Sequence, residues 1–104
     1  MASYNKLVRD KVPEHIERDG GKSFTHIAGD FEFHNQLMKK VAEEWNEYRR
    51  DKDPKELADL LELIKTIALE VHKLSYADLE GMRNAKEKTH GGFTKRIILE
   101  EAQD

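Results

Sequence analysis

Apolar residues recur at helical spacing through the middle of the chain, and this pattern constrains the fold more than any other feature. Over residues 30–50 they lie three or four positions apart, at Phe33, Leu37, Val41, Trp45 and Tyr48. Such spacing lines one face of an α-helix. We therefore predict a long amphipathic helix over residues 30–50.

A second helix begins shortly after the first. Asp53 followed by Pro54 is typical of an N-cap and a first helical position. The wide apolar face of this helix comprises Leu57, Leu60, Leu61, Ile64, Ile67, Ala68 and Val71. Because residues 51–53 leave only a short connection, the two helices should form an antiparallel hairpin.

A further helix is predicted over residues 75–90, where Ser75 and Asp78 resemble a capping box and Gly91 supplies a stop. At the front, Pro13 suits the start of a short helix that ends at Gly20 and Gly21. Residues 22–28 and 93–99 read as short strands that pair in a small β-hairpin. The predicted fold is one mainly α domain over residues 1–104, an antiparallel hairpin plus a further helix in an oligomeric helical bundle.

Composition limits the function classes. The 104 residues are 38% apolar and 38% charged and include no cysteine, which excludes disulfides, thiolate metal sites and cysteine nucleophiles. Eighteen basic against 21 acidic residues give a net charge of −3, which argues against nucleic-acid and membrane partners. With no apolar run of membrane-spanning length and a charged start, we expect a soluble cytoplasmic protein that binds small molecules or proteins.

Four carboxylates do not fit ordinary amphipathic helices. A helical projection puts Glu44 inside the apolar arc of the first long helix, with Glu47 about 60° further round at its edge. In the next helix, Glu56 projects inside the arc and Asp59 lies about 40° outside it. Each helix thus carries an acidic pair one turn apart.

The two acidic pairs also match in register. Residues equidistant from the turn of an antiparallel hairpin lie level, so Glu47 should face Glu56 and Glu44 should face Asp59. Four converging carboxylates repel one another unless a cation binds, and ligand sets made only of oxygen favour Mg²⁺ or Mn²⁺ over Zn²⁺. The alternative is a helical oligomerisation module in which neighbouring basic residues, among them Lys39, Lys40 and Arg49, neutralise the acids.

Basic and aromatic residues supply candidate contacts to a phosphorylated ligand. The candidates for binding phosphate are Lys6, Arg9, Lys11, Arg83, Lys86 and Lys88, of which Arg9 is the best single choice. Trp45, Tyr48 and Phe33 can stack on a base, although aromatic residues at helical spacing more often belong to a core.

Several motifs resemble one known superfamily. Glu43-Glu44-x-x-Glu47 followed by Glu56-x-x-Asp59 resembles the signature of the all-α nucleoside triphosphate pyrophosphohydrolases, which include MazG proteins and phosphoribosyl-ATP pyrophosphohydrolase. Residues 4–14 (YNKLVRDKVPE), 56–62 (ELADLLE) and 91–97 (GGFTKRI) are similar to small bacterial or phage proteins described as phosphoribosyl-ATP pyrophosphohydrolase-like. The resemblance covers nearly the whole chain, although the connection between Glu47 and Glu56 is shorter than is usual in MazG proteins.

The resemblance implies a helical dimer or tetramer with Mg²⁺ held by Glu44, Glu47, Glu56 and Asp59. It also implies cleavage of a nucleoside triphosphate between its α and β phosphates, which releases a monophosphate and pyrophosphate. Water attacks phosphorus directly in such a reaction, and Glu47 is the candidate for orienting it. The alternative substrate within this superfamily is phosphoribosyl-ATP, the intermediate of histidine biosynthesis.

Overall fold

Four helices make up the computed structural model of the chain, which describes residues 4–103. They are α1 (Val12–Arg18), α2 (Asp30–Asp51), α3 (Pro54–His72) and α4 (Tyr76–His90). Residues 4–103 contain no strand, so the prediction of a mainly helical fold is confirmed. No helix in this part of the chain is long and apolar enough to span a membrane.

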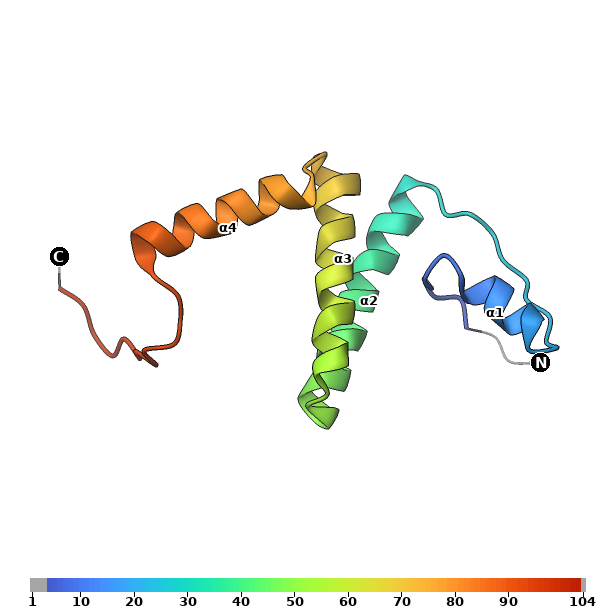
Figure 1. The fold of residues 1–104 in the computed structure, drawn as a ribbon, viewed down its shortest axis with the longest axis horizontal. Coiled ribbons are helices and arrows are strands. Elements are labelled where there is room, and N and C mark those ends of the chain that lie inside the picture. Colours follow the sequence, from blue (N-terminus) through green and yellow to red (C-terminus); the bar gives the residue numbers. More distant parts are fainter. Residues whose placement is uncertain (1–3, 104) are drawn as a thin grey trace.

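The α2 and α3 helices lie side by side and carry most of the packing (Figure 1). Lys52 adopts a left-handed conformation with φ of 56° and ends α2. The Asp53 side chain then accepts a hydrogen bond from the Lys55 backbone N–H at 2.9 Å, with Pro54 opening the helix. Since only two residues join the helices, the chain reverses direction, and residues near this turn are brought level.

The α4 helix begins with the capping box that the sequence predicts. The Asp78 backbone N–H donates to the Ser75 hydroxyl at 3.0 Å, and the Ser75 N–H donates to the Asp78 carboxylate at 3.1 Å. At the other end Gly91, with φ of 79°, ends the helix. The α4 helix packs only against α3 and projects away from the hairpin, as Figure 1 shows.

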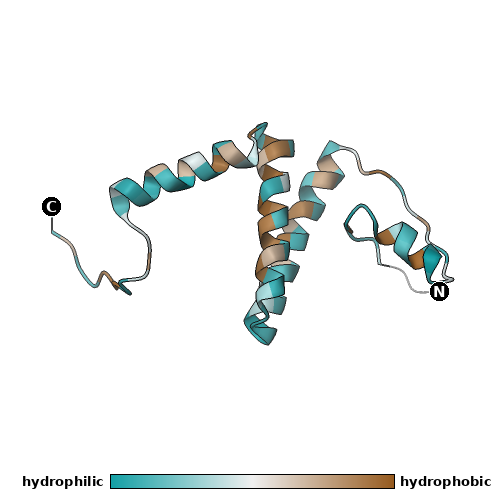
Figure 2. Ribbon diagram, viewed as in Figure 1, coloured by the Kyte–Doolittle hydropathy of each residue, from teal (hydrophilic) through white to brown (hydrophobic). Residues whose placement is uncertain are grey.

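The buried apolar core of the single chain is small. Within residues 4–103, Leu37 and Ala68 are the buried apolar residues, and of these Leu37 is fully buried. Apolar residues continue along α3 in Figure 2, and several of them, including Leu57, Leu61 and Ile64, are close to half exposed. An apolar hollow of about 150 Å³ lies where α3 meets α4 and is lined by Ile64, Ile67, Ala68, His72, Leu74 and Leu79.

The size of the exposed surface agrees with this sparse core. The accessible area is 9506 Å², whereas a compact chain of this mass exposes about 6,000 Å². The radius of gyration is 18.2 Å, against about 13 Å for a compact domain of this length. The single chain therefore leaves open much apolar area that a stable protein would cover.

The prediction of two paired strands is wrong. Residues 22–28 and 93–99 are both irregular, and they lie at opposite sides of the molecule in Figure 1. Because α2, α3 and α4 separate the two segments, they have no means of pairing within one chain. In the C-terminal segment Phe93, Ile97 and Leu99 alternate as in a strand, but all three are exposed.

Candidate functional site

Two glutamates are buried in the α2–α3 hairpin. Glu44 on α2 is 7% exposed and Glu56 in the first turn of α3 is 9% exposed, so the helical projection placed both correctly inside the packed face. Each has one carboxylate oxygen, Glu44 Oε2 and Glu56 Oε1, that is buried and makes no hydrogen bond within residues 4–103. An unsatisfied buried carboxylate oxygen is unfavourable and is characteristic of sites that bind a further group.

Two more acids lie at the edge of the same face. Glu47 and Asp59 are half-buried, one turn from Glu44 and Glu56 respectively. Their charges act across the hairpin, because Asp59 raises the pKa of Glu44 and Glu47 raises the pKa of Glu56. These are the two cross-hairpin pairs that the register predicts from sequence.

Burial is the main reason that both buried carboxyls have raised pKa values. For Glu44, burial raises the pKa most, and the charges of Glu47 and then Asp59 raise it further. For Glu56, burial is again the largest cause, followed by the charge of Asp51. The like charges are therefore close enough to disfavour one another, which is the electrostatic condition for attracting a cation.

A third glutamate of α2, Glu43, belongs to this group. One carboxylate oxygen each from Glu43, Glu44 and Glu47 can be chosen so that all lie within 4.8 Å of one another. The sequence motif Glu43-Glu44-x-x-Glu47 contains Glu43, but the four predicted ligands do not include it. Because Glu43 and Glu47 are four residues apart, they are neighbours on one face of the helix, and this spacing could have identified Glu43. We call Glu43, Glu44, Glu47, Glu56 and Asp59 the acidic cluster.

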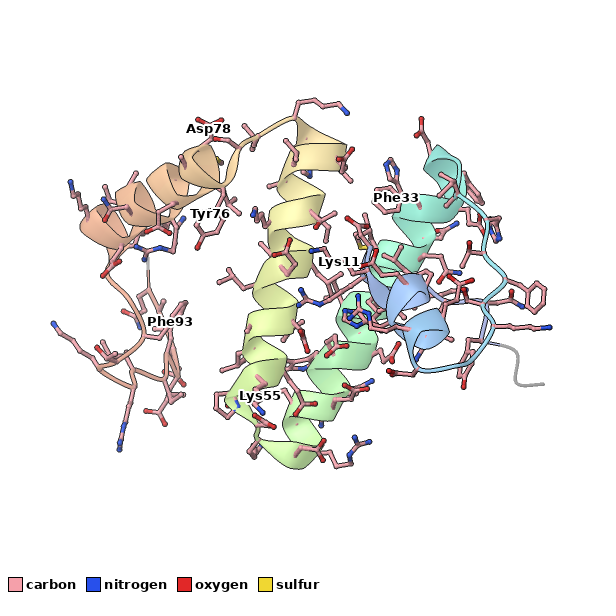
Figure 3. The ribbon with its side chains drawn as sticks, turned by 45° about the vertical axis from the view of Figure 1, so that its right-hand side comes forward. Lys11, Phe33, Lys55, Tyr76, Asp78 and Phe93 are labelled. Carbon is pink, nitrogen blue, oxygen red and sulfur yellow. The ribbon has the colours of Figure 1, made fainter. Side chains whose placement is uncertain are left out.

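Three basic residues contact the acidic cluster. Lys40 Nζ lies 3.6 Å from Glu43 Oε1 and 3.7 Å from Glu44 Oε1. Two of the predicted phosphate-binding residues come from the N-terminal segment: Lys6 Nζ lies 3.3 Å from Glu43 Oε1, and Arg9 Nη2 lies 2.6 Å from Asp59 Oδ1. Figure 3 shows this N-terminal part of the chain in front of the hairpin. The fold thus brings Lys6 and Arg9 to the acids.

The other phosphate candidates lie elsewhere. Lys11 is exposed and makes no ion pair within residues 4–103. On α4, Arg83 is held by Glu80 at 2.7 Å and by Glu87 at 2.6 Å, and these bonds raise the pKa of its guanidinium. Lys86 and Lys88 are exposed on the same helix, which points away from the hairpin. A single chain therefore does not bring the three α4 residues to the acidic cluster.

Two aromatic residues of α2, Trp45 and Tyr48, stack on each other. The rings of Trp45 and Tyr48 lie 5.7 Å apart with an interplanar angle of 25°, and the Lys52 ammonium lies 5.6 Å from the Tyr48 ring centroid. Trp45 is 48% exposed and Phe33 is half-buried, so neither belongs to a closed core in the single chain. In the sequence Trp45 directly follows Glu44, and Tyr48 directly follows Glu47.

The donor set of the site fits a hard divalent cation. All five acids offer oxygen, and two of the oxygens are buried and unpartnered. Mg²⁺ and Mn²⁺ prefer such ligands, whereas Zn²⁺ favours histidine and cysteine. Among residues 4–103, Glu43, Glu44 and Glu47 are the acids whose oxygens lie within 4.8 Å of one another, so the ligand set of Glu44, Glu47, Glu56 and Asp59 stays a prediction.

Replacing Glu44 tests the electrostatic cost of the buried charge. A raised pKa in the folded state means that the folded protein retains its proton to higher pH, so stability falls as pH rises through that pKa. In chelator at pH 7, Glu44→Gln should stabilise the protein by about 1 kcal/mol, because it removes a buried charge whose Oε2 makes no hydrogen bond within residues 4–103 and whose contact with Lys40 is as long as 3.7 Å. The gain should shrink toward zero near pH 3, where the carboxyl is neutral in both states. Urea unfolding measures both values.

The matched control is Glu62→Gln, which removes the same charge from an exposed position on α3. Its effect on stability should be small at either pH. If Glu44→Gln destabilised the chelated protein at pH 7 while Glu62→Gln did not, Lys40 would already balance the Glu44 charge and the carboxylate would be a purely structural partner.

Comparison with protein families, with curated proteins and with solved structures found no match to this chain. The functional assignment therefore rests on the motifs of the sequence and on the geometry of the acidic cluster.

Proposed function

We propose that the protein is a Mg²⁺-dependent nucleotide pyrophosphohydrolase. The observation that carries this proposal is the pair of buried carboxylates, Glu44 and Glu56, each with an unpartnered oxygen, flanked by Glu47 and Asp59. Structural ion pairs would leave these oxygens bonded to lysine or arginine. The resemblance of the acidic motifs to all-α nucleoside triphosphate pyrophosphohydrolases supports the same assignment.

Each charged group has a role in the proposed reaction. A bound divalent cation supplies charge neutralisation at the phosphates and lowers the pKa of water. Glu44, Glu47, Glu56 and Asp59 would hold the ion, with Mn²⁺ as a substitute for Mg²⁺. Glu47, at the edge of the buried face, orients the attacking water and accepts its proton.

The substrate we propose is a nucleoside triphosphate, cleaved between its α and β phosphates. Lys6 and Arg9, which already lie at the acidic cluster, would bind its phosphate oxygens, and arginine suits this role because its guanidinium binds two oxygens at once. The products are a nucleoside monophosphate and pyrophosphate. We propose a cytoplasmic location for this activity. Phosphoribosyl-ATP is the second candidate substrate, on the resemblance of residues 4–14 and 91–97.

We also propose that the active form is a homodimer or homotetramer. The excess of exposed surface over that of a compact chain, and the half-exposed apolar residues along α3, support association with further copies. Three basic residues of α4 do not reach the acids within their own chain. In such an assembly they would become available to the site of another copy; they are Arg83, Lys86 and Lys88. The same apolar surface is the observation that favours the alternative, a non-enzymatic helical oligomerisation module.

Product analysis tests the proposed reaction. Purified protein with Mg²⁺ should convert at least one member of a panel of ribo- and deoxynucleoside triphosphates and phosphoribosyl-ATP into monophosphate and pyrophosphate. Glu44→Gln and Asp59→Asn should lower the rate on the order of 100-fold or more, since metal-assisted charge stabilisation contributes several kcal/mol. Glu62→Gln should retain activity. Formation of diphosphate and orthophosphate, or full activity in Glu44→Gln and Asp59→Asn, would contradict the proposal.

Metal binding has its own readout in thermal unfolding. Adding Mg²⁺ to chelated protein at ten times its Kd should stabilise the folded state by about 1.4 kcal/mol, which raises the Tm of a chain this size by about 5 °C or more. The rise should disappear in Asp59→Asn and remain in Glu62→Gln. An equal rise in all three proteins would place the ion away from the acidic cluster, and no rise in the wild type would favour the oligomerisation module.

Light scattering after size-exclusion chromatography tests the assembly. The expected mass is two or four times that of the chain at micromolar concentration. Leu61→Asp, on the half-exposed face of α3, should shift the mass toward the monomer, because it buries a charge in the interface. The control Leu99→Asp makes the same change in the exposed C-terminal segment and should leave the mass unchanged. A monomeric wild type would contradict the proposed assembly.

A further inference from the structure

The segment formed by residues 4–11, which we call the basic arm, reaches the acidic cluster from a distant part of the sequence. Lys6 and Glu43 are 37 positions apart, and Arg9 and Asp59 are 50 positions apart, yet both pairs form ion pairs. Among the helices of residues 4–103, α1, which follows the arm, packs against none of the others. Lys6 and Arg9 are therefore the polar links between the arm and the hairpin.

One of these contacts uses Glu43, a member of the converging α2 trio, and the other uses Asp59, a metal ligand in the proposed site. Arg9 Nη2 forms an ion pair with Asp59 Oδ1 at 2.6 Å. Lys6 and Lys40 both form ion pairs with Glu43 Oε1. The buried acids Glu44 and Glu56, in contrast, keep unpartnered oxygens that neither arm residue reaches. The arm thus pairs with the exposed rim of the cluster and leaves these buried oxygens without a partner among residues 4–103.

Two cations that share a carboxylate must oppose each other's binding. If the arm weakens the affinity for a metal ion by some factor, the ion weakens docking of the arm by the same factor. The arm ion pairs are well exposed, Arg9 at 59% and Asp59 at 40%, so each contributes little stability and is easily exchanged. A divalent ion held by several carboxylates can therefore displace them.

We infer that the basic arm is an internal counter-cation of the acidic cluster, which competes with divalent metal ions and is released when they bind. This inference rests on the proposed metal site and adds its regulation. On release, the Arg9 guanidinium and the Lys6 ammonium leave the carboxylates and become free to bind an anion that arrives with the metal. Metal loading would thereby prepare the phosphate-binding groups.

Mn²⁺ titration followed by electron paramagnetic resonance tests the competition on the full chain, with the metal alone as the ligand. Arg9→Gln should lower the Kd for Mn²⁺ about two- to fivefold, the factor that corresponds to an exposed ion pair. Lys6→Gln should act in the same direction. The matched control is Arg18→Gln, which removes the same charge from α1, where Arg18 pairs with Glu14 and not with the cluster. Its Kd should match that of the wild type.

Hydrogen–deuterium exchange reports on the arm itself. In chelator, Arg9→Gln and Asp59→Asn should each speed amide exchange in residues 4–11, and the double variant should add little to either change, because both remove one contact. Saturating Mn²⁺ should speed amide exchange of the same residues in the wild type. It should not do so in the double variant that carries both Lys6→Gln and Arg9→Gln.

The outcomes separate this inference from the proposed function. Tight Mn²⁺ binding by the wild type with an unchanged or weakened affinity in Arg9→Gln would overturn the competition and leave the metal site standing. Slower exchange of residues 4–11 on addition of Mn²⁺ would do the same, because the ion and the arm would then bind together. Failure of the wild type and of both arm variants to bind Mn²⁺ would overturn the metal site and the competition together.

Discussion

Holding like charges inside a packed helical hairpin is the constraint on which the rest of the structure depends. Glu44 and Glu56 are more than nine-tenths buried between α2 and α3, and burial raises the pKa of both. The two-residue connection at Lys52 and Asp53 forces these carboxylates and their neighbours to opposite sides of one short stretch of the interface. A stable hairpin would place leucine or alanine there. Burying these acids costs the hairpin stability, and the divalent ion we propose would offset that cost by pairing with them.

The rest of the chain responds to this arrangement in two ways. Lys40 from α2 and the basic arm from the N-terminal segment supply positive charge around the rim of the cluster. The apolar faces that the hairpin does not use remain open along α3 and in the hollow next to α4. With Leu37 and Ala68 as its buried apolar residues, the hairpin gains limited stability from its own core, and covering the open faces in an assembly would add to it.

Local patterns in the sequence predict those features that depend on local geometry. The projection of residues 30–50 on a helix locates Glu44 in the buried face, because a regular helix fixes each side-chain direction from the spacing alone. Asp53 and Ser75 identify helix starts for a similar reason, since a capping side chain bonds to backbone groups two or three residues ahead. The cross-hairpin pairs follow from the short turn, which leaves a single register.

Features that depend on long-range contacts are harder to predict. The ion pairs of Lys6 and Arg9 with the cluster join residues far apart in sequence, and no spacing rule connects them. The alternation in residues 22–28 and 93–99 suggested strands, but a strand needs a partner, and the intervening helices keep these segments apart. Glu43 lies in the acidic motif but is not among the four predicted ligands, because these were chosen by their place in or near the buried face, whereas Glu43 is a half-exposed position.

The most direct test of the central claim is to locate the ion. A crystal of the protein grown with Mn²⁺ gives an anomalous scattering peak at each bound metal. We predict a peak between α2 and α3, with oxygens of Glu44 and Glu56 among its ligands at about 2.0–2.3 Å. A peak whose ligands include neither buried glutamate, in protein that is saturated with Mn²⁺, would contradict the account.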